Sequence, residues 1–153
     1  MNIELNLDNT KTILNFRWIS LQKDGHSVYL WDLDKKGTEK DQPAIYRFVL
    51  VDTNAGKITV YIGEGRSLNG PERNNLVHQW KQTPGETRQR VKGYIQRVRL
   101  PGWTEILCKP EIDLSNEKER KFLQELLIGA YYQEHRKLSS EFPAIPEFLN
   151  EPR

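Results

Sequence analysis

Two tyrosines of this 153-residue chain stand in short apolar stretches: Tyr46 ends the sequence AIY, and Tyr61 begins the sequence YIG. Arg73 and His78 follow them within one segment. The arginine side chain is a planar fork of donors that matches phosphate oxygens, and the histidine side chain titrates near physiological pH. A phenol beside a cation can accept or relay a proton. These residue types in this order predict chemistry on phosphodiesters, as in a nuclease.

Local sequence patterns place the four residues on a hairpin and on the helix after it. Residues 44–51 and 58–62 are apolar and aromatic runs that flank the polar sequence DTNAGK, which predicts an antiparallel hairpin. Pro71 suits the first turn of a helix that extends to about Trp80. The hairpin therefore carries both tyrosines, and the helix carries the arginine and the histidine.

Further elements are expected on both sides of this region. Apolar residues recur at helical spacing in residues 91–98, a strand is expected at 103–108, and the apolar pattern of residues 122–132 predicts a final long helix. Residues 3–7 alternate as in a half-buried strand, whereas residues 11–21 fit either a helix or a strand. We divide the chain into an N-terminal elaboration (1–43), a main domain (44–137) and an irregular C-terminal tail (138–153).

Composition indicates one domain in a reducing compartment. A chain of this length buries one real core, and 37% apolar with 29% charged residues is typical of a globular protein. The sequence has no apolar run long enough to span a membrane, and residues 1–8 lack the features of a secretory signal. Cys108 is the single cysteine, which excludes an internal disulfide and a cysteine-based zinc site. We expect a cytoplasmic location.

The charge of the chain is nearly balanced, at +2, so a nucleic-acid surface must come from local clustering. Residues 87–100 carry basic side chains and no acidic one, and this run lies mainly on the helix expected at 91–98. A further basic residue follows the YIG sequence after only two positions. The candidate phosphate contacts are Arg66, Arg88, Arg90, Lys92, Arg97 and Arg99. An ordinary solvated face is the alternative interpretation of the basic run.

Together, the two tyrosine stretches, the arginine and histidine after them, and the sequence LQELLI at 123–128 resemble the GIY-YIG nuclease family. The resemblance covers roughly residues 44–137. Alanine replaces the first glycine of the signature, and the spacing from Arg73 to His78 is one residue longer than usual. The resemblance implies an α+β fold, in which a small antiparallel sheet of about three core strands is flanked by helices, with an N-terminal extension.

The resemblance also implies hydrolysis of DNA phosphodiester bonds with one divalent ion, Mg²⁺ or Mn²⁺. Tyr46 would accept or relay the proton of the nucleophile, Tyr61 would orient the water or the phosphate, and Arg73 would stabilise the transition-state charge. His78 would position Tyr46 or the phosphate, or share in the proton transfer. The alternative for the two tyrosines is ordinary core packing with a polar tip.

A metal-binding glutamate on the final helix is the last feature that the resemblance implies. The register of LQELLI puts Gln124 at that position. A helical wheel places Gln124 on the apolar face, together with Leu127, and it places Glu125 on the polar face, together with Lys121. Two hypotheses stay open. Either the chain is a glutamate-to-glutamine form that binds DNA and cleaves it little, because a neutral amide holds Mg²⁺ less tightly, or the register is shifted and Glu125 is the ligand.

We therefore predict a metal-dependent DNA endonuclease of the restriction or stand-alone type, attenuated if Gln124 occupies the metal-binding position. Members of the restriction type commonly act as dimers, so a second copy of the chain is a candidate partner. RNA is an alternative to DNA as the substrate, and no membrane partner is expected. The main alternative function is a non-catalytic nucleic-acid-binding module on the same fold, and the third is a protein-interaction domain.

Overall fold

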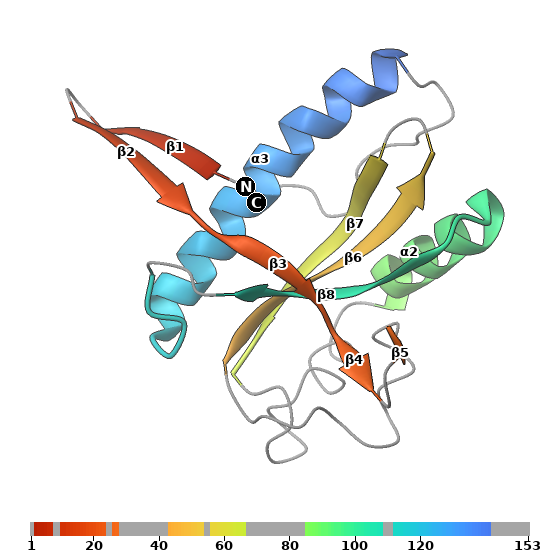
Figure 1. Ribbon diagram of the computed structural model, residues 1–153, viewed down its shortest axis with the longest axis horizontal. Helices are drawn as coiled ribbons and strands as arrows, with labels where there is room; N and C mark the ends of the chain where they lie inside the picture. Colours follow the sequence, from red (N-terminus) through yellow and green to blue (C-terminus); the bar gives the residue numbers. More distant parts are fainter. Residues whose placement is uncertain are drawn as a thin grey trace.

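The computed structural model describes residues 2–7, 10–23, 26–27, 43–53, 56–66, 85–108 and 112–141. Their architecture is α+β, as predicted, with a four-stranded antiparallel sheet and two helices within these residues (Figure 1). The strands lie in the order β3 (Arg17–Ser20), β8 (Gly102–Cys108), β6 (Ala44–Asp52) and β7 (Gly56–Gly65). The helices are α2 (Gly85–Val98) and α3 (Glu117–Glu141). Two separate strand pairs join β1 (Asn2–Leu7) to β2 (Thr10–Asn15) and β4 (Gln22–Lys23) to β5 (His26–Ser27).

The predicted hairpin is formed by β6 and β7 and includes the centre of the sheet. Gly56, at the start of β7, has a φ of 76°, a conformation that glycine adopts without a steric penalty. Tyr46 pairs with Gly63 and Phe48 pairs with Tyr61. Directly opposite residues of an antiparallel pair share a face, so both tyrosines lie on the same side of the sheet. A β-bulge follows between Phe48 and Val49.

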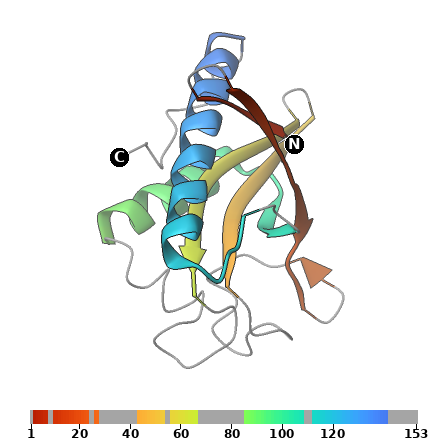
Figure 2. The same cartoon turned by 90° about the vertical axis from the view of Figure 1, so that its left-hand side faces the viewer.

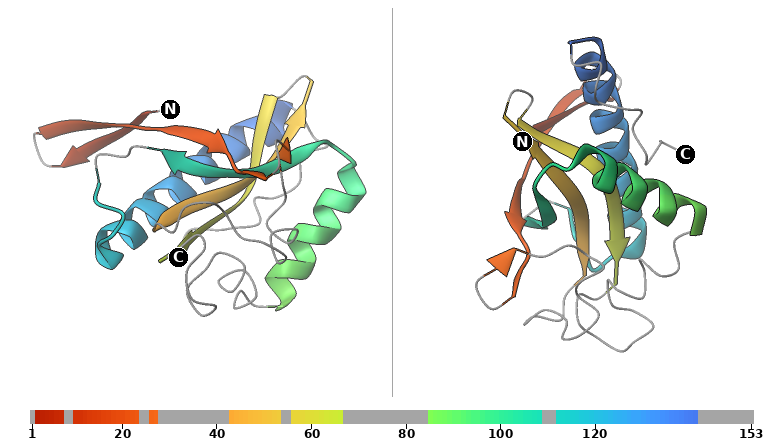
Figure 3. Two further views of the ribbon diagram at one scale, coloured as in Figure 1. Left: turned by 60° about the horizontal axis from the view of Figure 1, so that its bottom comes forward. Right: turned by 90° about the vertical axis from the view of Figure 1, so that its right-hand side faces the viewer.

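The two helices cover opposite faces of the sheet (Figures 2 and 3). On one face, Val91, Tyr94 and Ile95 of α2 pack in a cluster that includes Tyr46 and Phe48. On the other face, a second cluster joins residues of α3 to β6, β7 and β8; it includes Ile45, Ile62, Leu107, Leu123, Leu127 and Ile128. Residues 44–50 are all buried, because successive side chains enter the two clusters in turn. This explains why the first hairpin strand is apolar at every position from 44 to 50 except Arg47.

The fourth strand of the sheet comes from the predicted N-terminal elaboration. Residues 11–21, which fitted a helix or a strand in the sequence, form most of β2 and all of β3. β3 pairs with β8 from Arg17 opposite Cys108 to Ser20 opposite Glu105. Phe16 enters the α3-facing cluster, and its packing makes this part of the chain continuous with the main core. The sheet therefore has one strand more than the three core strands expected.

Polar side chains define the start of α3, the helix that carries Gln124. Asn116 is its N-cap, because Asn116 Oδ1 accepts a hydrogen bond of 3.1 Å from the Glu119 amide. The helix extends through residues 138–141, which were predicted to be an irregular tail. Between Gly129, which lies within the helix, and Pro143 the chain has no proline or glycine, so nothing local ends the helix earlier. Residues 142–153 and the helix expected at 71–80 lie outside the described residues.

Neither of the two described helices is both long and apolar enough to cross a bilayer.

Candidate functional site

The two signature tyrosines meet on the α2 side of the β6–β7 hairpin. Tyr46 is 1% exposed and Tyr61 is 8% exposed, and their ring centroids are 6.2 Å apart at an interplanar angle of 35°. Tyr46 lies across Gly63 of the neighbouring strand, where an added Cβ would overlap the phenol ring. The glycine of YIG is therefore required for this packing, and the phenol comes to the end of β7 because Gly63 has no side chain.

The surroundings of Tyr46 keep its hydroxyl protonated. Burial raises the pKa of Tyr46 well above its ordinary range, and the nearby Tyr61, by charge and by hydrogen bonding, and the charge of Glu64 raise it further. At neutral pH the phenol is therefore a hydrogen-bond donor and not a base. Both tyrosines are core residues, so they have the packing role that the sequence offered as an alternative. A role for Tyr46 as a base would need its proton to be drawn away.

Gln124 lies where the helical wheel predicted, toward the sheet. Its side chain is half-buried, and its Nε2 donates to the backbone carbonyl of Ile62 at 3.4 Å, the residue before Gly63. Glu125 is half-buried as well. Lys121, which the sequence pattern paired with Glu125, lies with its Nζ 2.9 Å from Glu117 Oε1. From α3, the structure thus brings the amide of Gln124 to the YIG end of β7.

A shielded ion pair lies beside Gln124. Arg120, one helical turn earlier, places its Nε 2.6 Å from Oε2 of Glu64, the residue after Gly63. Its Nη1 also donates to the carbonyl of Leu114 at 3.0 Å. Neither Arg120 nor Glu64 was predicted from the sequence as a site residue. Glu64 could have been noticed, because it is an acidic residue within an otherwise uncharged stretch of β7, and a carboxylate that is shielded from water requires a cation.

The donor set does not fit a carboxylate-based magnesium site. Mg²⁺ prefers oxygen ligands, and carboxylates supply most of its protein contacts. Gln124 offers a neutral amide, and the Glu64 carboxylate is ion-paired to Arg120. Within the part of the chain that the structure describes, no group of three or more histidine, cysteine, aspartate or glutamate side chains could hold a metal ion. Among the described residues, neither Gln124 nor Glu125 therefore belongs to such a group.

The basic residues predicted to contact phosphate fall in two places. Arg66 is exposed and directly follows β7. Arg90 and Arg97 are exposed and two helical turns apart, so they share the outward face of α2, while Lys92 is half-buried. Arg99 is exposed just beyond the helix and has a φ of 53°.

The side chain of Arg88 lies outside the described residues, although its backbone belongs to α2. Arg73 and His78 lie outside the described residues altogether.

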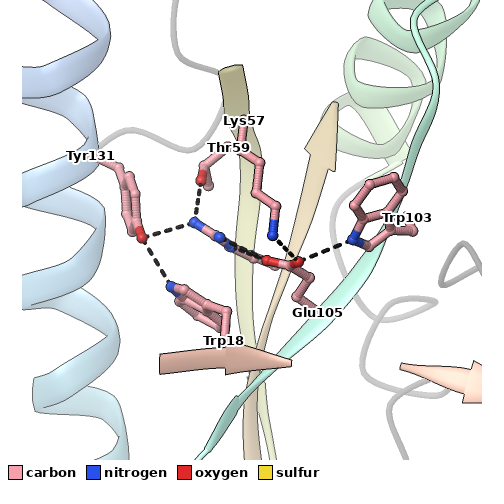
Figure 4. Close-up of polar contacts among 7 residues, drawn as sticks. Trp18, Lys57, Thr59, Trp103, Glu105 and Tyr131 are labelled. Carbon is pink, nitrogen blue, oxygen red and sulfur yellow. Dashed lines mark hydrogen bonds and ion pairs between the residues drawn. The ribbon is translucent and has the colours of Figure 1, made fainter. Parts of the chain in front are cut away.

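A buried polar network on the α3 side of the sheet was missed in the sequence (Figure 4). Arg47 of β6 stands directly opposite Glu105 of β8. Its Nε and Nη2 donate to Glu105 Oε1 at 3.0 and 2.7 Å, and its Nη1 donates to Thr59 Oγ1 at 3.0 Å and to the Tyr131 hydroxyl at 2.8 Å. The guanidinium also lies over the Trp18 ring, with Cζ 4.6 Å from the ring centroid.

The second oxygen of Glu105 completes the network. It accepts from Lys57 Nζ at 2.7 Å and from Trp103 Nε1 at 3.0 Å. Burial opposes ionisation of Glu105, but the hydrogen bonds from Lys57, Trp103 and Arg47 outweigh it and lower the pKa of the carboxyl. In the sequence, Arg47 and Glu105 are single charged residues within apolar stretches of their strands. That they pair with each other depends on the register between β6 and β8, which the local pattern of each strand does not specify.

Comparisons of the chain with protein-family models, with curated proteins and with solved structures found no match. Since a fold alone does not imply an activity, the evidence on function lies in the side chains of the site.

Proposed function

We propose that this chain acts on DNA as a GIY-YIG-like nuclease whose cleavage is attenuated by Gln124. The observation that carries the proposal is the packing of Tyr46 across Gly63, beside Tyr61, on neighbouring antiparallel strands. Arg66 follows the same strand directly and is exposed to a ligand. The two tyrosine stretches of the resemblance thus lie on neighbouring strands with their rings in contact, which supports the proposal for these residues.

The chemistry requires charge stabilisation more than a strong base. In hydrolysis of a phosphodiester, an oxygen of water bonds to phosphorus and the bond to one bridging oxygen breaks. The water gives up a proton, and the departing oxygen takes one up through solvent to leave as a hydroxyl. Negative charge increases on the phosphate oxygens in the transition state. Arg66 and Arg73 are the proposed partners of that charge, because guanidinium donors match phosphate oxygens. Tyr46 holds its proton at neutral pH and is proposed to donate a hydrogen bond to the phosphate.

A gain-of-function variant tests the proposal. Gln124→Glu restores the charge of the expected ligand, and we expect it to increase nicking of supercoiled DNA in Mg²⁺ or Mn²⁺ by about tenfold or more over the natural chain. Gln133→Glu is the matched control, because it adds the same charge at an exposed position of the same helix. It should leave the nicking rate unchanged.

The outcome that contradicts attenuation by Gln124 is equally specific. A folded Gln124→Glu protein that cleaves no faster than the Gln133→Glu control would remove that explanation. Loss of existing cleavage activity on Glu125→Ala, with Gln124 intact, would identify Glu125 as the ligand and support the shifted register.

Non-catalytic binding of nucleic acid is the second candidate function. It is favoured by the neutral amide of Gln124, whose nitrogen donates to Ile62, and by the ion-paired state of Glu64. In this case DNA binds without turnover, and Arg66→Ala lowers affinity in a fluorescence anisotropy assay. Failure to retain either DNA or RNA at low salt would favour the protein-interaction domain.

A further inference from the structure

The ion pair between Arg120 and Glu64 joins α3 to the strand that carries the YIG sequence. Their side chains are 5% and 16% exposed, and the two residues are far apart in the chain. Arg120 is also anchored at a second point, since its Nη1 donates to the Leu114 carbonyl. In a pair so shielded from water, loss of one partner leaves the other charge uncompensated. The position of Arg120 is thus determined by tertiary structure and not by a chance surface contact.

The pair lies on the α3 side of the sheet, as Gln124 does, whereas the two tyrosines lie on the α2 side. Glu64 directly follows Gly63, across which Tyr46 lies on that other side. Gln124 is one helical turn after Arg120, and its donor reaches the carbonyl of Ile62, two residues before Glu64. The guanidinium is therefore a positive charge that the protein itself supplies beside the carboxylate and the amide of the site.

A guanidinium and a divalent ion compete for the same carboxylate. Mg²⁺ and Mn²⁺ need direct contact with several oxygens, and Oε2 of Glu64 is already held by Arg120 Nε. Gln124 contributes no negative charge with which to attract an ion. A divalent ion would have to displace a shielded guanidinium without gaining a second carboxylate, which makes its binding unfavourable.

We propose that Arg120 is the resident cation of this site: its guanidinium neutralises Glu64 in place of a divalent ion, and nucleic acid binds there without a metal. The identity of the ligand rests on the proposed function. The ion pair between Arg120 and Glu64 does not depend on a ligand, so its effect on metal binding is tested without nucleic acid.

Mn²⁺ alone is the probe, titrated into the full chain and followed by the electron paramagnetic resonance signal of the free ion. We expect the natural chain to show no saturable binding at micromolar Mn²⁺. Arg120→Gln removes the competing charge and should bind Mn²⁺ about tenfold or more tightly than the natural chain. Lys121→Gln is the matched control, because it removes the neighbouring exposed cation, which pairs with Glu117 instead. Its Mn²⁺ affinity should equal that of the natural chain.

Two results would overturn the proposal. One is saturable micromolar Mn²⁺ binding by the natural chain, and the other is an Arg120→Gln protein that is folded by circular dichroism yet binds Mn²⁺ no better than Lys121→Gln. If Arg120→Gln does not fold, the natural chain decides: at matched ionic strength its DNA affinity should be no higher in Mg²⁺ than in EDTA, and a requirement for Mg²⁺ overturns the proposal. Absence of DNA binding in both solutions refutes the proposed function, and the Mn²⁺ titration of the natural chain still decides the role of Arg120.

Discussion

At the scale of single residues, Gly63 and Tyr46 determine the shape of the candidate site. The phenol ring of Tyr46 occupies the volume that a side chain at position 63 would need, so Tyr46 can adopt this position only with glycine at 63. This pairing gives the YIG glycine a physical reason that does not depend on catalysis. It also separates two roles of Tyr46, packing and chemistry, which can be measured independently.

Gly63→Ala should destabilise the protein by about 1–3 kcal/mol, because its Cβ overlaps the Tyr46 ring and forces the strand or the ring to shift. The free energy of unfolding is measured by urea denaturation. Gly93→Ala is the control, since Gly93 is exposed in α2 and an added Cβ meets nothing within 4 Å. It should stabilise the protein by about 0.5–1 kcal/mol through helix propensity. Equal effects of the two substitutions would contradict the packing described for Tyr46.

At the scale of elements, the Arg47–Glu105 network joins strands of the sheet to α3. The register of β6 and β8 places Arg47 opposite Glu105. The Tyr131 hydroxyl of α3 accepts hydrogen bonds from both Arg47 and Trp18 of β3. Lys57 is exposed, but Arg47, Glu105 and Tyr131 are buried, so the network is costly to leave incomplete. It therefore fixes α3 against the sheet, and with it the helix face that carries Gln124.

Glu105→Gln should lower the free energy of unfolding at pH 7 by about 3–5 kcal/mol, because it leaves the Arg47 charge uncompensated. The pKa of Glu105 is lower in the folded protein than in the unfolded chain, so the ionised carboxylate stabilises the fold. This stabilisation is fully present above the ordinary carboxyl pKa and is lost as the pH falls through the pKa of the folded protein. The difference between the two proteins should therefore be constant at neutral pH and shrink in acid.

Urea denaturation at a series of pH values measures this difference. Glu117→Gln is the control, since Glu117 is exposed and pairs only locally with Lys121, and its effect should be small at every pH. A difference between natural chain and Glu105→Gln that stays the same from neutral to strongly acidic pH would show that the charge of Glu105 does not stabilise the fold.

At the scale of the whole molecule, a net charge of +2 is distributed unevenly. The outward face of α2 presents Arg90 and Arg97, roughly 10 Å apart along the helix axis, and Arg99 follows the helix. The first turns of α3, on the opposite side of the sheet, carry both signs, with Glu117 paired to Lys121 (Figure 3). The basic face of α2 is thus the better candidate for extended contact with phosphates.

Arg90→Ala combined with Arg97→Ala should weaken DNA binding and make it less dependent on salt. Each lost phosphate contact lowers the slope of log K against log salt by about 0.9 for duplex DNA, so two contacts remove about 1.8. Fluorescence anisotropy at several salt concentrations measures this slope. Gln89→Ala with Gln96→Ala is the matched control, because both glutamines are exposed on the same helix and carry no charge. If both double variants change the slope equally, α2 is not the phosphate-binding face.

Sequence patterns alone predicted most of the helices and strands that flank the candidate site. Apolar periodicity and turn residues predicted the β6–β7 hairpin, α2, β8 and α3, and the structure has each of them. The helical wheel also predicted which face of α3 turns Gln124 toward the sheet. These features depend on residues a few positions apart, where the repeat of the helix or strand sets which side chains share a face. Residues 11–21 stayed ambiguous because their apolar positions fit both repeats.

Only the tertiary structure decided how distant charges pair. Arg47 with Glu105 and Arg120 with Glu64 join residues 58 and 56 positions apart, and β3 reaches the sheet by pairing with β8. Their partners depend on strand order and on the register between segments, which the periodicity of each segment leaves free. The sequence therefore indicated the tyrosines and the glutamine of the candidate site. The cation beside them could be identified only after the chain had folded.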